Sequence, residues 1–293
     1  YDNRQEASLT YNWNLSIERE VIPEWLVRAA YVGSASNYGR TTKQLNPAQY
    51  MPGSSLGTDA RRLFAPDLGG IDYYTEDRRS HYHSGQLSLT KRLSRGFTLL
   101  GSYTFSKSMD DFASFVTPWY FPDGNRMHVG PSDFDHKHRL VFSWVWNVPN
   151  AATSNGFARQ VLHGWQWSGS TQYQTGSPIT IRSGRDNSQT GLGQDRAILT
   201  GASLDPAAGS EKRVWFNPAA FAVNPVGTFG TLGRNTIYGP HLFSFDLGIF
   251  KTFRLTERAG LQFRTEFFNA FNQVNFANPN NNATGGGFGT ITS

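Results

Sequence analysis

The chain has 293 residues and no cysteine, which excludes a disulfide framework, a thiol nucleophile and a cysteine-based metal site. Its net charge of +5 comes from scattered Lys and Arg residues, which argues against a nucleic-acid stripe, and no run of about 18 apolar residues predicts a spanning helix. Charged residues are only 17%, whereas aromatic residues reach 14% and glycines number 30, which indicates extended β-structure with one face suited to lipid.

Alternation of apolar and polar residues recurs along the chain and predicts about eight β-strands. In the first strand, one face carries Leu9, Tyr11, Trp13, Leu15 and Ile17. The predicted strands form four hairpins, which are residues 8–20 with 25–33, 81–92 with 96–107, 139–148 with 164–176, and 242–253 with 261–276. Each strand has roughly the 9–11 residues that a tilted strand needs to cross a bilayer.

The connections between these strands alternate in length. Those within the hairpins are short, apart from a moderate one at residues 149–163, whereas those between hairpins span residues 35–80, 109–137 and 177–240. Long connections are unusual in a compact soluble domain, and this alternation is typical of an outer-membrane barrel with tight periplasmic turns and extended outer loops. The sequence therefore predicts an all-β fold, an antiparallel transmembrane β-barrel segment of about eight strands that is part of a larger barrel with long extracellular loops.

A soluble β-sandwich is the alternative, because its strands also alternate apolar and polar residues. Sandwich strands are typically shorter, and their connections do not alternate so regularly in length. Aromatic residues at the strand ends also favour the barrel, where they would form a membrane-interface girdle. These residues are Trp25, Phe97, Trp146, Trp165 and Phe253.

Four segments resemble the C-terminal barrel of TonB-dependent outer-membrane receptors, specifically the Oar-like subfamily. They are HSGQLSLTKRLSRGFTLLGSYTFSKSMDD, PSDFDHKHRLVFSWVWNVP, HGWQWSGSTQYQTGSPITI and the long run from WFNPAAF to NQVNF. Their order and spacing carry the resemblance, which covers most of the chain from residue 8 onward.

The resemblance implies a large barrel that is closed inside by an N-terminal plug. Such receptors bind a scarce ligand at the outer face, among them siderophores, cobalamin, sugars and peptides, and import it with energy passed through TonB. By this comparison residues 1–293 are the C-terminal part of the barrel, with the N-terminal plug, the early barrel strands and the final closing strand absent. The expected localisation is the outer membrane of a Gram-negative-type bacterium.

The resemblance also gives the last predicted strand, residues 261–276, a role. Its apolar residues fall at helical spacing too, but its Asn and Phe content and the lack of a cap argue against a helix. As a strand it directs Leu261, Phe263 and Phe267 to lipid. The lumen-facing polar ladder is then Gln262, Arg264 and Glu266, in which Arg264 and Glu266 are expected to pair with each other or with the plug.

Few motifs point to chemistry. His81 and His83 share a strand face, but no third ligand is fixed beside them, so a plain strand start is favoured over a metal pair. The Gly-rich stretches do not open a helix after a strand, and residues 183–195 lack the spacing of a calcium loop. We therefore expect no catalytic residue, no metal site, no cofactor and no enzymatic activity.

A denser group of titratable residues precedes the strand at residues 139–148. It consists of Asp133, Asp135, His136 and His138, which would suit a cation or acid/base site. The resemblance favours a structural junction between loop and strand instead, in which Asp pairs with Arg139.

The predicted outer loops carry candidate ligand contacts. Aromatic residues suited to a sugar or siderophore ring are Tyr73, Tyr74, Trp119 and Tyr120. The favoured alternative is that they pack the loops over the barrel mouth or against the plug. An anionic ligand could be guided by Arg61, Arg62, Arg78 and Arg79, although internal pairing is equally consistent with the acids nearby, which are Asp67, Asp72, Glu76 and Asp77.

The leading functional hypothesis is active uptake of a siderophore, carbohydrate or similar nutrient, with this segment supplying wall and ligand-gating loops. Its expected partners are outer-membrane lipid, its own plug and the TonB complex, and a small-molecule or oligosaccharide ligand, with no nucleic acid. The alternative is a structural or adhesion barrel whose long loops bind surface partners. A soluble carbohydrate-binding sandwich is a distant third.

Overall fold

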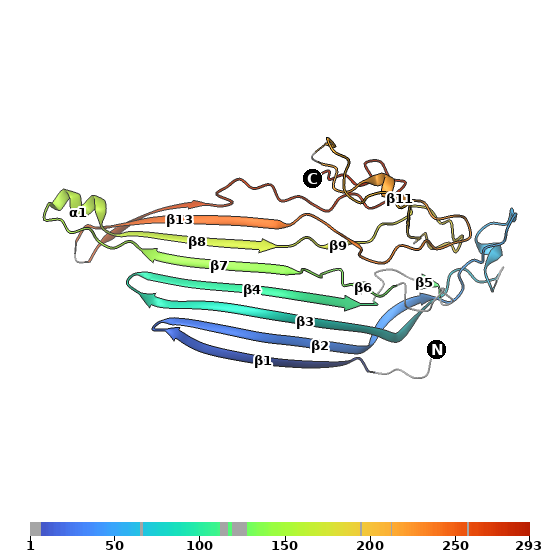
Figure 1. The fold of residues 1–293 in the computed structure, drawn as a ribbon, viewed down its shortest axis with the longest axis horizontal. Helices are drawn as coiled ribbons and strands as arrows, with labels where there is room; N and C mark the ends of the chain where they lie inside the picture. The colour runs from blue at the N-terminus through green and yellow to red at the C-terminus, as the bar shows by residue number, and fades with distance from the viewer. Residues whose placement is uncertain are drawn as a thin grey trace.

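The computed structural model describes residues 7–64, 67–111, 117–118, 128–193, 195–211, 213–256 and 258–293. Its main feature is one curved antiparallel sheet in which eight long strands lie side by side in chain order (Figure 1). These strands are β1 (Leu9–Ile22), β2 (Trp25–Gln44), β3 (Asp72–Ser94), β4 (Phe97–Asp110), β7 (His138–Asn147), β8 (Trp165–Gln174), β13 (Leu242–Arg254) and β14 (Gly260–Phe267). The predicted all-β fold with four hairpins is confirmed.

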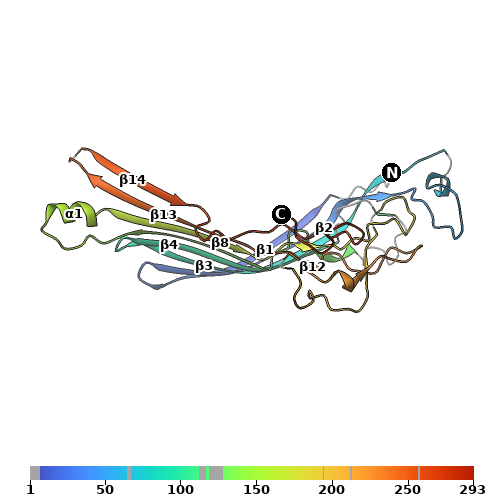
Figure 2. The same cartoon turned by 90° about the horizontal axis from the view of Figure 1, so that it is seen from above.

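The sheet is bent into an open trough, with β14 rising along one side (Figure 2). Among the described strands, β1 pairs only with β2, and β14 pairs only with β13, so both are edges. Short strands β5 (Thr117–Pro118) and β6 (Gly130–Pro131) attach to the outer ends of β2 and β4. In the described part of the chain, no helix has the length and apolar character needed to cross a membrane.

The register separates apolar from polar residues on the two faces of the sheet. One row of directly opposed residues runs across six strands as Ala29, Leu87, Tyr103, Leu140, Tyr173 and Phe243. The adjacent row points to the other face and runs as Arg28, Ser88, Ser102, Val141, Gln172 and Ser244. We call these the apolar face and the polar face. Because side chains alternate along each strand, a register slip of one residue would exchange the two faces.

Hairpin turns explain why the strands reverse at one end of the sheet. Glu24, at φ 73°, closes the β1–β2 turn, and its N–H donates to Glu20 Oε1 at 2.6 Å. Arg95 and Gly96 both have positive φ in the β3–β4 turn. The predicted connection at residues 149–163 is longer because it contains helix α1 (Gly156–Leu162), which is capped by the Asn155 side chain.

At the opposite end, the boundaries predicted for the first long loop were wrong. β2 continues to Gln44 and β3 begins at Asp72, so the connection is shorter than residues 35–80. Bulges between Ser36 and Arg40 absorb the irregular register there, which is why the simple alternation of the sequence ended early. With 20 and 23 residues, β2 and β3 exceed the ~9–11 residues of a membrane crossing and extend past it.

The long connection after β8 folds into a compact unit, which we call the outer lobe, formed by residues 175–241 and 277–293. Its buried apolar core contains Ile179, Ile181, Ala197, Phe216, Ala220, Phe221 and Leu232, with Phe288 packed against it. Two short strand pairs frame this core, namely β9 (Pro178–Ile179) with β12 (Ile237–Tyr238) and β10 (Ile198–Leu199) with β11 (Phe221–Ala222). Because the lobe packs on itself, the connection is not the unstructured loop that its length alone suggests.

The last predicted strand is shorter than residues 261–276, because β14 ends at Phe267. Asn269 and Asn272 adopt positive φ, and the Asn269 side chain accepts the Gln273 N–H at 2.9 Å, so a turn replaces further strand. Phe271 stacks on Phe245 with ring centroids 4.9 Å apart. Beyond this turn the chain returns to the outer lobe, where the Trp215 N–H donates to Gly289 O at 2.8 Å.

Candidate functional site

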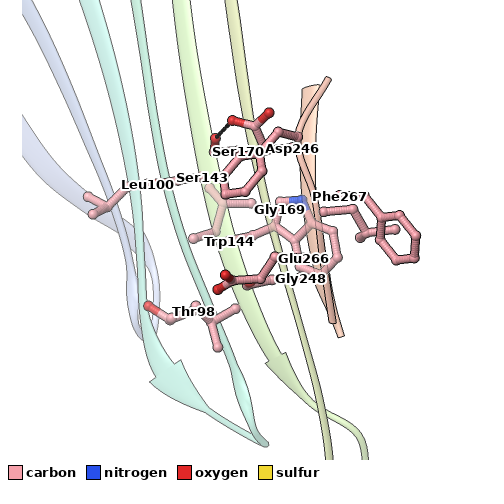
Figure 3. Close-up of a pocket in the computed structure, with 15 residues that line it drawn as sticks. Thr98, Leu100, Ser143, Trp144, Gly169, Ser170, Asp246, Gly248, Glu266 and Phe267 are labelled. Atoms are coloured by element: carbon pink, nitrogen blue, oxygen red, sulfur yellow. Dashed lines mark hydrogen bonds between the residues drawn. The ribbon is translucent and has the colours of Figure 1, made fainter. Parts of the chain in front are cut away.

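The polar face forms a groove of about 400 Å³ between β4 and β14 (Figure 3). Hydroxyls from three neighbouring strands line it, together with the carboxylates of Asp246 and Glu266 and with apolar side chains that include Leu100, Val145 and Phe268. Ser170 Oγ donates to Asp246 Oδ2 at 3.4 Å, as Figure 3 shows. The groove therefore offers acceptor oxygens and negative charge on the inner side of the trough.

The polar ladder of β14 lies on this same face. Gln262, Arg264 and Glu266 oppose Thr252, Phe250 and Gly248 of β13. Of the two pairings expected for Arg264 and Glu266, the one with each other is not observed: among the described residues no ion pair joins them, and the Arg264 guanidinium lies 5.0 Å from the Phe250 ring centroid. Pairing with the plug stays a prediction. Alternate residues of one strand are about 7 Å apart, so a nearby ring in the facing strand is the closer partner for a long Arg side chain.

The titratable group before β7 forms a hydrogen-bonded junction between the sheet and the outer lobe. Asp135 is buried and accepts the Ser108 N–H at 2.6 Å, the Tyr238 hydroxyl at 2.7 Å and Lys107 Nζ at 3.2 Å. Burial, with the hydrogen bond to Asp135, raises the pKa of Tyr238, so the phenol remains a donor at neutral pH. All three donors hold one carboxylate in place, which favours the structural interpretation of this group.

The expected Asp–Arg139 pairing at this junction was also wrong. Asp133 accepts the Asn235 amide at 2.7 Å and lies 3.6 Å from Arg234 Nη1, and both partners belong to the outer lobe. Arg139 points along the polar face of β7, away from the loop that carries the acids, because it directly opposes Gln174 and Thr104. Arg234, which meets Asp133, lies more than 90 residues away in sequence and could not be found by local spacing, whereas Asp135 meets Lys107 of β4.

Two of the histidines, His83 and His138, pair with tyrosines. His83 Nδ1 lies 2.7 Å from the Tyr31 hydroxyl, and His138 Nδ1 lies 2.7 Å from the Tyr103 hydroxyl. Both pairs are on the apolar face toward its outer end. They form polar tips on an otherwise apolar surface, as expected where an apolar layer ends.

The candidate loop aromatics do not form one surface in the described residues. Tyr73 and Tyr74 are consecutive on β3 and therefore point to opposite faces. Tyr74 is exposed, with the Arg40 guanidinium 4.3 Å from its ring centroid. Trp119 and Tyr120 lie outside the described residues.

Of the four candidate arginines, two are held by hydrogen bonds within their own loop and, for Arg61, to the outer lobe. Arg61 donates to the carbonyls of Gln49, Leu56 and Gln189, and Arg62 binds Asp59 and the Asn46 carbonyl. Arg79 is exposed, whereas Arg78 is fully buried. Sequence reasoning missed the residues that the fold brings near Arg78, which are His128, Arg196 and Arg234, because they lie on separate loops without a shared motif.

Comparison with known proteins agrees with this architecture. The family described as the outer membrane beta barrel domain matches residues 1–293, the whole chain. The chain belongs to this outer membrane β-barrel family. It is therefore a protein of the bacterial outer membrane, with its apolar face against lipid.

Among solved structures, the chain resembles the outer membrane transporter YddB from Escherichia coli, with a TM-score of 0.51 at 10% sequence identity. The match covers 99% of this chain and 32% of that one, so this chain spans about a third of the transporter's length. At this identity the likeness shows the fold alone. No curated protein sequence matches the chain.

Within the outer membrane barrel family, the short-turn end of the sheet is the periplasmic end. The predicted aromatic girdle lies there, and it surrounds two lysines of the apolar face. Lys91 Nζ is 5.9 Å from the Trp25 ring centroid, and Lys251 Nζ is 5.3 Å from that of Trp165. Both ammonium groups donate to carbonyls at the strand ends, those of Phe97 and His163. Such lysines mark the level at which the lipid hydrocarbon gives way to headgroups.

Proposed function

We propose that this barrel segment belongs to a TonB-dependent uptake receptor of the Oar-like type. The observation that carries the proposal is the pairing of a polar, concave inner wall with a folded lobe at its outer end, in a sheet that resembles an outer membrane transporter. A barrel that only anchors an adhesin needs no carboxylate-lined groove facing its interior. Here Asp246 and Glu266 bring negative charge to the inner wall, where a plug would add further hydrogen-bond donors.

The proposed partner of this wall is the receptor's plug. Hydroxyls and carboxylates on the polar face suit a reversible hydrogen-bonded contact, because a wet polar interface separates at lower cost than an apolar one. The plug would rest against the groove and the Gln262, Arg264 and Glu266 ladder, and would move when TonB pulls on it. The chain's own residues supply wall and ligand-gating loops, and no covalent chemistry.

The outer lobe would take the ligand at the cell surface. Its junction with the sheet, centred on Asp135, fixes it to the ends of β4 and β7. In this proposal the lobe, fixed at the outer end of the sheet, carries the ligand-binding surface. It would pass a nutrient, such as a siderophore or an oligosaccharide, from the outer face to the plug.

Two measurements test the proposal on the protein made from its complete reading frame. The purified receptor in detergent is first titrated with the periplasmic domain of TonB, and saturable binding is expected. Cells with and without the gene are then supplied with radiolabelled ferric citrate, cyanocobalamin and maltodextrin, with and without a protonophore. Uptake that needs both the gene and the proton-motive force supports the receptor. If the reading frame encodes no plug and TonB does not bind, the adhesion barrel becomes the better proposal.

A further inference from the structure

Arg78 is a buried cation without a hydrogen-bonded partner. Its side chain is 0% exposed, and its Nε, Nη1 and Nη2 atoms all lack a hydrogen-bond acceptor. The nearest carboxylate oxygen, Asp77 Oδ1, is 3.6 Å from Nε, and the other oxygen of Asp77 accepts from Lys43. A guanidinium group has five N–H donors, and burying them unsatisfied is costly. Arg78 therefore has an unused fork of donors.

The fold aims this fork toward the barrel interior. Arg78 and Ser80 are two residues apart on β3, and Ser80 opposes Asp110 on β4, in the same alternation as Ser84 and Ser88 of the polar face. Gly39 lies opposite Arg78 on β2 and adds no side chain in front of it. Arg78 thus lies on the polar face, at the outer end of the wall, where the loops meet the sheet.

Two further arginines converge on the same region from the outer lobe. Arg196 Nη2 lies 3.0 Å from His128 Nδ1, and Arg234 donates to Gly130 O at 3.4 Å, two residues farther along from His128. Both arginines are 2% exposed. We call Arg78, Arg196 and Arg234 the arginine cluster.

His128 reports the electrostatic potential within this cluster. Burial first, and then the proximity of Arg196, Arg78, Arg234 and Lys43, lowers the pKa of His128 to about 3. Every charge that shifts this imidazole is positive. Four cations therefore lie close to this histidine, and the acids Asp77 and Asp110 lie beside Arg78 and Arg234.

The acids near the arginine cluster already have partners. Asp110 accepts from Arg234, and Asp111 Oδ1 accepts the Arg79 N–H at 2.7 Å. Asp77 is taken by Lys43. None of these carboxylates accepts a hydrogen bond from the Arg78 guanidinium. The charge of the cluster is thus partly balanced, but the Arg78 donors stay unused.

We propose that Arg78, with Arg196 and Arg234 beside it, binds an oxyanion group of the transported ligand, either a phosphate or a carboxylate. Planar guanidinium forks match both groups in geometry and charge, and a buried setting strengthens the contact. The role as a substrate site rests on the proposed uptake function, whereas the binding of the anion does not. The ligand class is thereby narrowed to nutrients that carry an acidic group, such as a carboxylate siderophore or a phosphorylated sugar.

The test uses the full-length protein in detergent and isothermal titration calorimetry with inorganic phosphate, with citrate and with neutral maltose. Saturable binding of phosphate, citrate or both, and none of maltose, is expected, and the stronger of the two identifies the group. Arg78→Gln should weaken that binding by about tenfold or more, because the charged fork is lost. The control Arg79→Gln changes an exposed neighbour on the opposite face and should stay within about twofold of the wild type.

Arg78→Lys keeps the charge but not the fork, and should still lose most of the affinity. Absence of saturable binding of either anion to the wild-type protein would overturn the proposal without reference to any variant. Equal affinities of Arg78→Gln and Arg79→Gln would overturn it too. Anion binding by a protein that fails to bind TonB would refute the uptake function and leave the oxyanion site standing. TonB binding by a protein that binds neither anion would refute the oxyanion site and leave the uptake function standing.

Discussion

The outer lobe should open when its aromatic core is truncated. Phe216 is 2% exposed, and its ring centroid lies 5.3 Å from that of Phe221 and 5.2 Å from that of Phe288. Phe216→Ala removes a buried ring from a core of few residues, which costs about 3–5 kcal/mol. At ~1.4 kcal/mol per tenfold, the equilibrium constant for lobe opening rises by roughly two to four orders of magnitude.

Surface proteolysis measures this opening. Chymotrypsin added to intact cells should cleave the lobe of Phe216→Ala much faster than the wild-type lobe, while the membrane sheet stays folded. The control is Phe157→Ala, whose ring is 80% exposed on α1, and whose effect should stay within about 0.5 kcal/mol. Equal cleavage rates for all three proteins would refute the lobe as a cooperatively packed unit.

A double-mutant cycle tests whether residues 277–293 belong to the lobe. Because Phe216 and Phe288 contact each other edge to face, their combined effect should be non-additive by about 0.5–1.5 kcal/mol. Strict additivity would mean that Phe288 lies elsewhere, for example on a further strand of the sheet. The cycle therefore distinguishes the observed packing of the last residues from the strand that their position after β14 suggests.

Three other predictions concern the lipid face, the junction and pH. Leu15→Arg puts a charge on the apolar face near the bilayer centre and should lower the folding stability by about 2–4 kcal/mol, measured as folding yield into lipid vesicles. The control Ser16→Arg changes the neighbouring residue on the polar face and should lower the stability far less. Asp135→Ala leaves the Tyr238 hydroxyl, and the other groups that donate to Asp135, without their acceptor. The junction should lose about 3–5 kcal/mol of stability, which is measured as faster hydrogen exchange around Tyr238. Unchanged exchange there would contradict the prediction. The pKa of His128 falls from 6.5 to about 3 on folding, so the unfolded chain binds the proton more readily and lobe stability should drop as pH falls below 6.5. The rate of chymotrypsin cleavage at each pH measures this stability. In His128→Gln the cleavage rate should depend less on pH than in the wild type, and an unchanged pH dependence would contradict the prediction.

The strands and faces were predictable from sequence because their signal is local. Each residue of a strand such as Leu9–Ile22 reports its face by its position in a two-residue period, and the hairpin turns follow from Gly and positive-φ positions nearby. Errors appeared where the period was interrupted. The bulges of β2 and β3 hid some twenty residues of additional strand, and the Asn-rich turn after Phe267 cut the last strand short.

The outer lobe and the arginine cluster were not predictable because their contacts are distant in sequence. Thr180 O accepts from the Asn281 side chain 101 residues away, and Arg234 reaches Asp110 across 124 residues. Nothing in the local sequence around Arg78 distinguishes it from Arg79, although one is buried and the other exposed. Burial of a charge depends on which loops cover it, and a single sequence without its fold does not contain that information in readable form.

The polar face carries opposite charges at its two levels, and this constrains how a ligand can pass. The arginine cluster makes the outer end positive, whereas Asp246 and Glu266 make the groove below it negative. An oxyanion drawn to Arg78 by the positive field would be repelled by the bare groove. Asp246 accepts from Ser170 Oγ and from the Asn269 N–H, but both donors are neutral and leave its negative charge in place. Under the proposed uptake function, a plug with basic residues at this level would neutralise that charge before an acidic ligand moves inward. While such a plug covers the groove, the ligand would stay at the mouth of the barrel. Displacement of the plug would then change the electrostatic field that acts on the ligand.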